Sequence, residues 1–223
     1  MLPWIQLASA AIPGENGELR LKQRGNEFSI MLGSNELMNS RLSGSEEALA
    51  TLSREKIKGH ARPNILIGGL GMGFTLRAAL SVLPEDAAII VAELVPAVVQ
   101  WARGPMSKVF QGCLDDPRVA LHEGDVGDLV RRSKARFDAI LLDVDNGPDG
   151  LTRRSNDRLY DFAGLRAARD ALRPGGVLAV WSSGPDASFT RRLRDCGFAV
   201  DAVNTRANGK RGGARHVIWL AVK

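Results

Sequence analysis

The chain has 223 residues, 44% of them hydrophobic and 25% charged, which suits a soluble protein with one α/β domain and a small appendage. No apolar run reaches the roughly 18 residues of a membrane helix, and no lysine or arginine precedes Arg20, so we expect neither a membrane span nor a signal peptide. Two distant cysteines and three isolated histidines lack the spacing of a disulfide framework or a metal site, and a cytoplasmic location fits.

The net charge of +5 comes mainly from arginines scattered along predicted helices, as in residues 131–136 and 191–194. Such dispersed charge is typical of solvated helix faces, so nucleic acid is not an expected partner. The denser stretch RANGKRGGARH, residues 206–216, is expected to be a hairpin loop.

The N-terminal region has short alternating segments separated by Pro-Gly, Gly-Asn and Gly-Ser turns. They predict strands at residues 5–12, 18–24, 27–32 and 36–40. The stretch S-G-S-E-E, Ser43 to Glu47, then opens a helix that extends to about Lys58. We therefore expect residues 1–60 to form a β-strand appendage with a linking helix, and residues 61–223 to form a Rossmann-like domain.

From residue 64 onward, apolar runs alternate with amphipathic segments. Near-continuous apolar runs are typical of strands buried on both faces of a parallel sheet, and they occupy residues 65–67, 87–92, 119–122, 137–142, 177–181, 198–203 and 216–222. Helices are expected between them, near residues 73–82, 95–103, 125–133, 156–172 and 186–196. This order predicts a doubly wound α/β fold with a seven-stranded sheet. Its last strand is expected to be antiparallel, because no helix precedes it.

The first strand of this region ends in IGGLGMG, which contains Gly69, Gly71 and Gly73. Glycines allow a tight turn and a close approach of backbone to a ligand, and the following helix presents free N–H groups. A plain strand-to-helix turn also uses glycines, so the loop alone does not identify a ligand.

Acidic residues follow the next three strands. Glu93 suits hydrogen bonding to ribose hydroxyls, and Asp125 suits either a ligand or a helix N-cap. The fourth strand runs into LLDVDNGPDG, with Asp143, Asp145 and Asp149. The carboxyl ends of parallel strands meet at one edge of a sheet, so these acids are expected to surround one site. Carboxylates repel a pyrophosphate and attract a sulfonium, which favours a donor of the S-adenosylmethionine type over NAD.

Together these motifs resemble the polyamine aminopropyltransferases, the spermidine synthase family. Five motifs of the family occur here in the same order. The family has G-G-G-D-G-G, V-E-x-D, D-P-R-V…G-D, D-S-S-D-P and L-K-P-G-G. The corresponding segments of this chain are IGGLGMG, VAELVP, DDPRVALHEGDV, FDAILLDVDNGP and ALRPGGVLAVWS. The resemblance covers residues 64–183. It implies a class I S-adenosylmethionine-dependent methyltransferase fold and a homodimer. It also implies that the co-substrate is decarboxylated S-adenosylmethionine or S-adenosylmethionine, that no metal takes part, and that the acceptor is a small amine.

The resemblance also implies roles for individual residues. Glu93 would hold the ribose hydroxyls and Asp125 the adenine amino group, beside the glycine loop. Asp143 would be the base that keeps the attacking amine deprotonated, and Asp145 would replace the family's second aspartate after a shift of the loop.

Four positions depart from known patterns. Gly71 stands where the family has an aspartate that reads the aminopropyl group, and Ile67 stands where methyltransferases place an acid for the methionine amine. Ala50 and Thr51 align with the tyrosine and glutamine that face the diamine in the family. Aminopropyl transfer is the leading hypothesis. The alternatives are methyl transfer to an unknown acceptor and a non-catalytic nucleoside-binding homologue.

Overall fold

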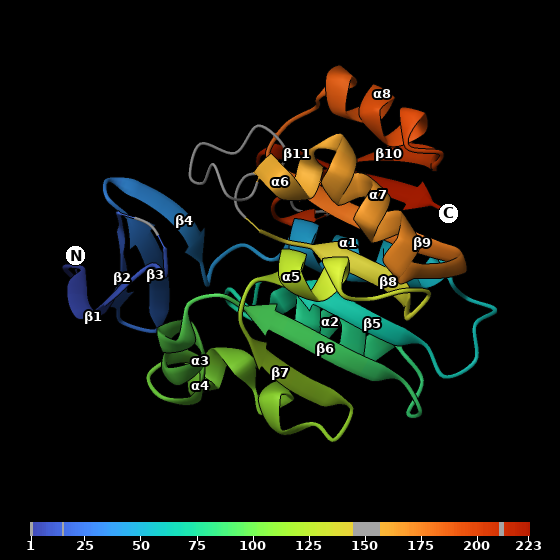
Figure 1. Cartoon of the computed structure of the whole chain (residues 1–223). Helices are drawn as coiled ribbons and strands as arrows, with labels where there is room; N and C mark the ends of the chain where they lie inside the picture. The colour runs from blue at the N-terminus through green and yellow to red at the C-terminus, as the bar shows by residue number, and fades with distance from the viewer. Residues whose placement is uncertain (1, 15, 145–156, 210–211) are drawn as a thin grey trace.

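A computed structural model describes residues 2–14, 16–144, 157–209 and 212–223, and it contains two sheets (Figure 1). The smaller sheet lies near the N-terminus and is antiparallel, in the order β1-β2-β3-β4. Its strands are β1 Ile5–Ala11, β2 Glu18–Arg24, β3 Glu27–Leu32 and β4 Asn35–Asn39. Helix α1, Gly44–Lys56, follows it and leads to the larger sheet. The four strands and the helix predicted for this region are confirmed.

The larger sheet has seven strands in the order β10-β11-β9-β8-β5-β6-β7. Strand β11 is antiparallel to both of its neighbours, as predicted, and the other pairs are parallel. The chain moves outward from β5 through β6 and β7, and then returns to the other side of β5 at β8. Ligands bind at such reversals of strand order. The strands are β5 Asn64–Gly68, β6 Ala88–Glu93, β7 Val119–Glu123, β8 Phe137–Leu142, β9 Leu172–Ser182, β10 Ala199–Arg206 and β11 Arg215–Val222.

Helices cover both faces of this sheet (Figure 1). On one face, Ile65 and Ile67 join the core that contains residues of α1, α2 and α3. On the other face, Leu66 joins the core of α5, α7 and α8. Strands buried on both sides explain the continuous apolar runs of the sequence. The remaining helices are α2 Phe74–Val82, α3 Pro96–Arg103, α4 Ser107–Phe110, α5 Val126–Arg131, α6 Asp157–Tyr160, α7 Phe162–Ala171 and α8 Ala187–Asp195, with a 3-10 turn at Cys113–Asp115.

One helix prediction was wrong. The segment predicted as a single helix over 156–172 contains α6 and α7, separated at Asp161. The Asp161 carboxylate accepts a hydrogen bond from the backbone N–H of Gly164 at 2.7 Å and so caps a new helix. The strand predicted at 177–181 begins earlier, because β9 pairs with β8 from Leu172 onward.

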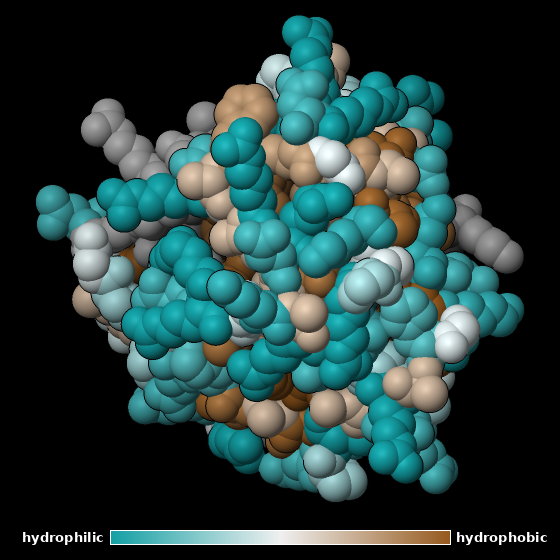
Figure 2. Space-filling view, turned by 45° about the vertical axis from the view of Figure 1, so that its right-hand side comes forward, coloured by the Kyte–Doolittle hydropathy of each residue, from teal (hydrophilic) through white to brown (hydrophobic). Residues whose placement is uncertain are grey.

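The surface is predominantly hydrophilic on the face shown in Figure 2, with apolar side chains in small groups between polar ones. This agrees with the arginines that the sequence distributes along helices. No helix in the described part of the chain is both long and apolar enough to cross a membrane.

Candidate functional site

The glycine loop joins β5 to α2 and requires backbone conformations that other residues rarely adopt. Gly69, Gly71 and Gly73 have φ angles of +91°, +52° and +76°. A Cβ atom at Gly69 would collide with the carbonyl oxygen of Asp143. The loop therefore lies directly against the end of β8, and the Gly69 N–H donates to the Ala92 carbonyl of β6 at 2.9 Å.

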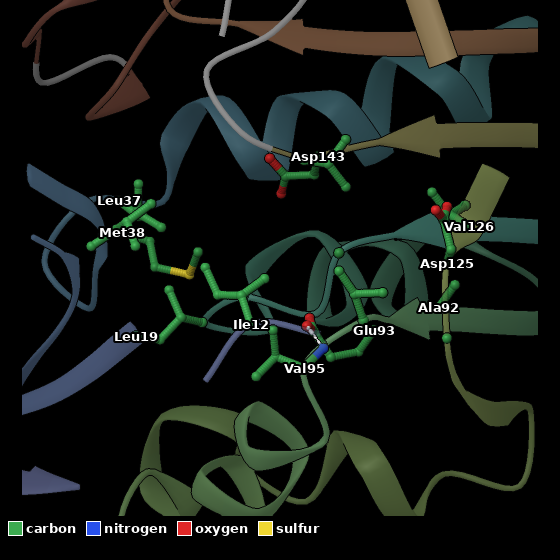
Figure 3. A pocket seen from close by; sticks show the side chains of 16 residues that line it. Ile12, Leu19, Leu37, Met38, Ala92, Glu93, Val95, Asp125, Val126 and Asp143 are labelled. Atoms are coloured by element: carbon green, nitrogen blue, oxygen red, sulfur yellow. Dashed lines mark hydrogen bonds between the residues drawn. The ribbon is translucent and has the colours of Figure 1, made fainter. Parts of the chain in front are cut away.

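Glu93 ends β6 and holds the glycine loop through backbone hydrogen bonds. Its Oε2 accepts from the Leu70 N–H at 2.9 Å, and its Oε1 accepts from the Val95 N–H at 2.9 Å (Figure 3). Burial raises the pKa of Glu93, and the backbone N–H donors oppose that rise. The carboxylate is thereby fixed in orientation at the edge of a pocket, with lone pairs left for hydroxyl donors.

Asp125 follows β7 and is the N-cap of α5. Its Oδ1 accepts from the Gly127 N–H at 2.6 Å. The side chain also lines the same pocket as Glu93, so one residue combines the cap with a place at the site. The sequence left these two roles as alternatives, and the structure shows the cap.

Asp143 follows β8 and is partly buried beside the glycine loop. Its N–H donates to the Gly68 carbonyl at 3.0 Å, and its Oδ2 accepts from the Thr75 hydroxyl of α2 at 2.7 Å. Burial raises the pKa of this carboxyl, while the Thr75 hydrogen bond opposes the rise. Asp145 and Asp149 lie outside the described residues.

A pocket that is open to solvent is lined by residues of both sheets. Figure 3 shows the acids Glu93, Asp125 and Asp143 on the side of the larger sheet. The small sheet supplies the opposite, apolar wall from Ile12, Leu19, Leu37 and Met38. Apolar walls with a few placed polar groups are typical of small-molecule sites.

A second hollow adjoins this pocket, and both are lined by Asp143 and Gly71. It also contains Glu46, which comes from the first turn of α1. Burial is the main cause that raises the pKa of Glu46 to about 7, and the nearby Asp143 charge adds to it. The other lining residues are Leu37, Met38, Asn39, Leu70, Met72, Phe74 and Trp181.

Neither Ala50 nor Thr51, the residues aligned with the family's tyrosine and glutamine, lines the hollow. Ala50 is only 3% exposed and belongs to the hydrophobic core, and the exposed Thr51 donates to the Glu47 carbonyl of its own helix. Only the first turn of α1 reaches the hollow, so Glu46 lines it instead. The stretch S-G-S-E-E predicted this first turn of the helix, but no sequence argument placed Glu46 near Asp143.

The glycine that replaces the family's aspartate faces the small sheet. A Cβ atom at Gly71 would lie 3.2 Å from the sulfur of Met38. Met38 lines both the pocket and the hollow. The Met38 side chain therefore occupies the space next to Gly71 that a longer side chain would need.

Comparisons with known proteins agree with this geometry. Residues 45–187 match the family model described as the spermine/spermidine synthase domain. A polyamine aminopropyltransferase of Nitrosomonas europaea is 36% identical over 127 residues, which are 57% of this chain and 37% of that protein. One from Mycobacterium tuberculosis is 33% identical over 149 residues, 63% of this chain and 27% of that protein.

Among solved structures, the spermidine synthase of Thermotoga maritima is similar, with a TM-score of 0.76 and 21% identity over 98% of this chain and 72% of that one. This similarity supports the fold. The chain spans well under half the length of the two curated relatives.

Proposed function

The chain belongs to the spermine/spermidine synthase domain family, and on this basis we propose that it transfers an aminopropyl group from decarboxylated S-adenosylmethionine to an amine acceptor. The observation that carries the proposal is the position of Asp143, a partly buried carboxylate that lines both the pocket and the acidic hollow beside it. A base at this junction can reach both the electrophilic carbon of a donor and an incoming amine.

The donor would lie in the pocket between the sheets. Glu93 would accept hydrogen bonds from the ribose hydroxyls, and Asp125 would accept one from the adenine amino group. Gly69, Gly71 and Gly73 would allow the donor close access to the backbone. The apolar wall of the small sheet would cover the adenine and exclude water.

The charges of the site favour the decarboxylated donor. Among the described residues that line the pocket and the hollow, none is a lysine or an arginine. The carboxylate of S-adenosylmethionine would therefore lie near Asp143 and Glu46 without a cation to balance it. A terminal ammonium, as in the decarboxylated donor, is instead attracted.

Asp143 would accept a proton from the acceptor, so that the neutral amine attacks the carbon beside the sulfonium. Burial raises the pKa of Asp143, which makes its carboxylate a stronger proton acceptor. Asp145 would be a second carboxylate at the acceptor, although it lies outside the described residues. The cytoplasmic location and the homodimer stay predictions.

The test is a transfer assay with decarboxylated S-adenosylmethionine and a panel of linear amines, in which we expect methylthioadenosine as product. Asp143→Asn should lower kcat/KM by about 10³-fold, within the range of a lost general base, while the affinity for methylthioadenosine stays unchanged in calorimetry. No product with any amine, or tighter binding of S-adenosylmethionine than of its decarboxylated form, would contradict the proposal. The second result would favour methyl transfer.

A further inference from the structure

Two carboxylates face the same hollow from different parts of the fold. Glu46 comes from α1 and Asp143 from the end of β8, and both line the space next to Gly71. The Thr75 hydroxyl lies between the two segments, 2.7 Å from Asp143 Oδ2 and 3.4 Å from the Glu46 carbonyl oxygen. Within the described lining, no lysine, arginine or histidine balances their charge.

The Glu46 side chain is held in place by a chain of contacts. The Ser45 hydroxyl donates to Glu46 Oε2 at 2.8 Å, and His216 Nδ1 of β11 lies 2.9 Å from that hydroxyl oxygen. The His216 ring packs edge-on against Trp181, with 4.7 Å between centroids. Since Ser45 donates to the carboxylate, the His216 Nδ1–H donates to Ser45.

The start of α1 is also fixed by the backbone of the β10–β11 connection. The Gly44 N–H donates to the Ala207 carbonyl at 2.9 Å, and a Cβ atom at Gly44 would collide with the backbone of Gly209. This close approach positions the first turn of α1 against the hollow. Glu46 therefore belongs to a rigid arrangement, unlike a mobile surface acid.

We propose that Glu46 and Asp143 form a carboxylate pair that binds the ammonium group of the acceptor amine and takes its proton before attack. This inference rests on the proposed function and adds Glu46 as a second catalytic carboxylate, contributed by the front helix. The substrate class that such a pair recognises is an aliphatic amine that is cationic in solution.

The proposed step balances in charge and electrons. A proton moves from the acceptor ammonium to one carboxylate of the pair, and the freed lone pair forms the new carbon–nitrogen bond. The carbon–sulfur bond breaks, its electrons stay on sulfur, and the sulfonium becomes a neutral thioether. The product is a secondary ammonium, so the pair regains its resting state by releasing one proton to solvent.

The surroundings of both acids favour their neutral forms. Burial raises the pKa of both, of Glu46 to about 7, and the charge of Asp143 adds to the rise at Glu46. Glu47 on the same helix adds a further like charge. Burial lowers the pKa of His216, which faces Glu46 through Ser45, so this histidine is neutral at pH 7.

The decisive variant is Glu46→Gln, with Glu47→Gln as the matched control on the exposed side of the same turn. Glu46→Gln should lower kcat/KM for the acceptor by about 100-fold, as expected for a lost general base, and should remove or displace the rising limb of the pH–rate profile near pH 7. Its affinity for methylthioadenosine should stay unchanged. Glu47→Gln should keep kcat/KM near the wild-type value and should retain the rising limb, moved only slightly, because Glu47 is the smallest of the causes that raise the pKa of Glu46. Wild-type kcat/KM and an unaltered pH profile in Glu46→Gln would overturn the inference.

A binding measurement separates this inference from the proposed function. In calorimetry of the protein saturated with methylthioadenosine, 1,4-diaminobutane should bind at least about tenfold more weakly to Glu46→Gln than to wild type, since a buried charge-assisted contact is lost. Glu46→Asp should recover part of the affinity. If no amine is turned over but the two proteins differ in affinity for 1,4-diaminobutane, the proposed function is wrong and the binding of an amine by the carboxylate pair is supported. Equal binding to both proteins, or none to wild type, would overturn the pair.

Discussion

Burial gives Glu46 and Asp143 surroundings that favour their neutral forms. The pKa of Glu46 rises from an ordinary value of 4.5 to about 7 in the folded protein. The folded state therefore binds a proton at this site more tightly than the unfolded chain does. The stabilisation that comes from this tighter proton binding at Glu46 is complete below pH 4.5 and is lost as the pH rises through 7.

The variant Glu46→Gln should for this reason change the pH dependence of stability. The free energy of unfolding of Glu46→Gln minus that of wild type should increase by about 2 kcal/mol from pH 4 to pH 8. The reason is that glutamine carries no charge to bury at high pH. Urea unfolding at both pH values measures this difference. Glu47→Gln should show no such dependence, and an equal effect of Glu46→Gln at both pH values would contradict the prediction.

The elements around the site depend on the glycine loop, which packs against α4 as well as β8. At Gly73 the φ angle is +76°, and a Cβ atom would lie 2.5 Å from the ring of Phe110. No L side chain fits there without moving the ring or the loop. The turn into α2 is therefore fixed by packing on both of its sides.

Gly73→Ala should destabilise the protein by about 2–4 kcal/mol, because it combines backbone strain with a collision in the core. Gly184→Ala is the control, since no heavy atom lies within 4 Å of a Cβ at that position. Thermal unfolding of the two variants measures the difference. A Gly73→Ala protein as stable as the control would show that the loop can relax.

The sequence predicts elements well where burial produces a continuous pattern. The central strands β5 and β8 were found because both of their faces are buried. Glu93, Asp125 and Asp143 were located because parallel strands end at one edge of a sheet. The short α4 and the break at Asp161 have too few residues to show a period. Glu46 was missed because its role depends on how α1 packs against β8 and β11, which no local pattern encodes.

At the scale of the whole molecule, the site lies at one end of the larger sheet, and a separate polar cluster stabilises the opposite end. Asp138 at the start of β8 is 2% exposed and accepts hydrogen bonds from the Asn64 N–H at 2.7 Å and from Arg173 at 2.7 Å. The His60 ring nitrogen lies 2.8 Å from its other oxygen. One buried carboxylate thus joins the segment after α1, the start of β5 and the start of β9.

Asp138→Ala should therefore separate stability from binding. Removing this carboxylate leaves a buried N–H group and a guanidinium without their acceptor, so we expect a loss of about 3 kcal/mol in the free energy of unfolding. The affinity for methylthioadenosine at a temperature where the variant is folded should equal that of wild type, because the cluster and the pocket lie at opposite ends of β8. Urea unfolding and calorimetry on the same preparation measure both quantities. Weaker nucleoside binding with unchanged stability would mean that the two ends of the sheet are coupled.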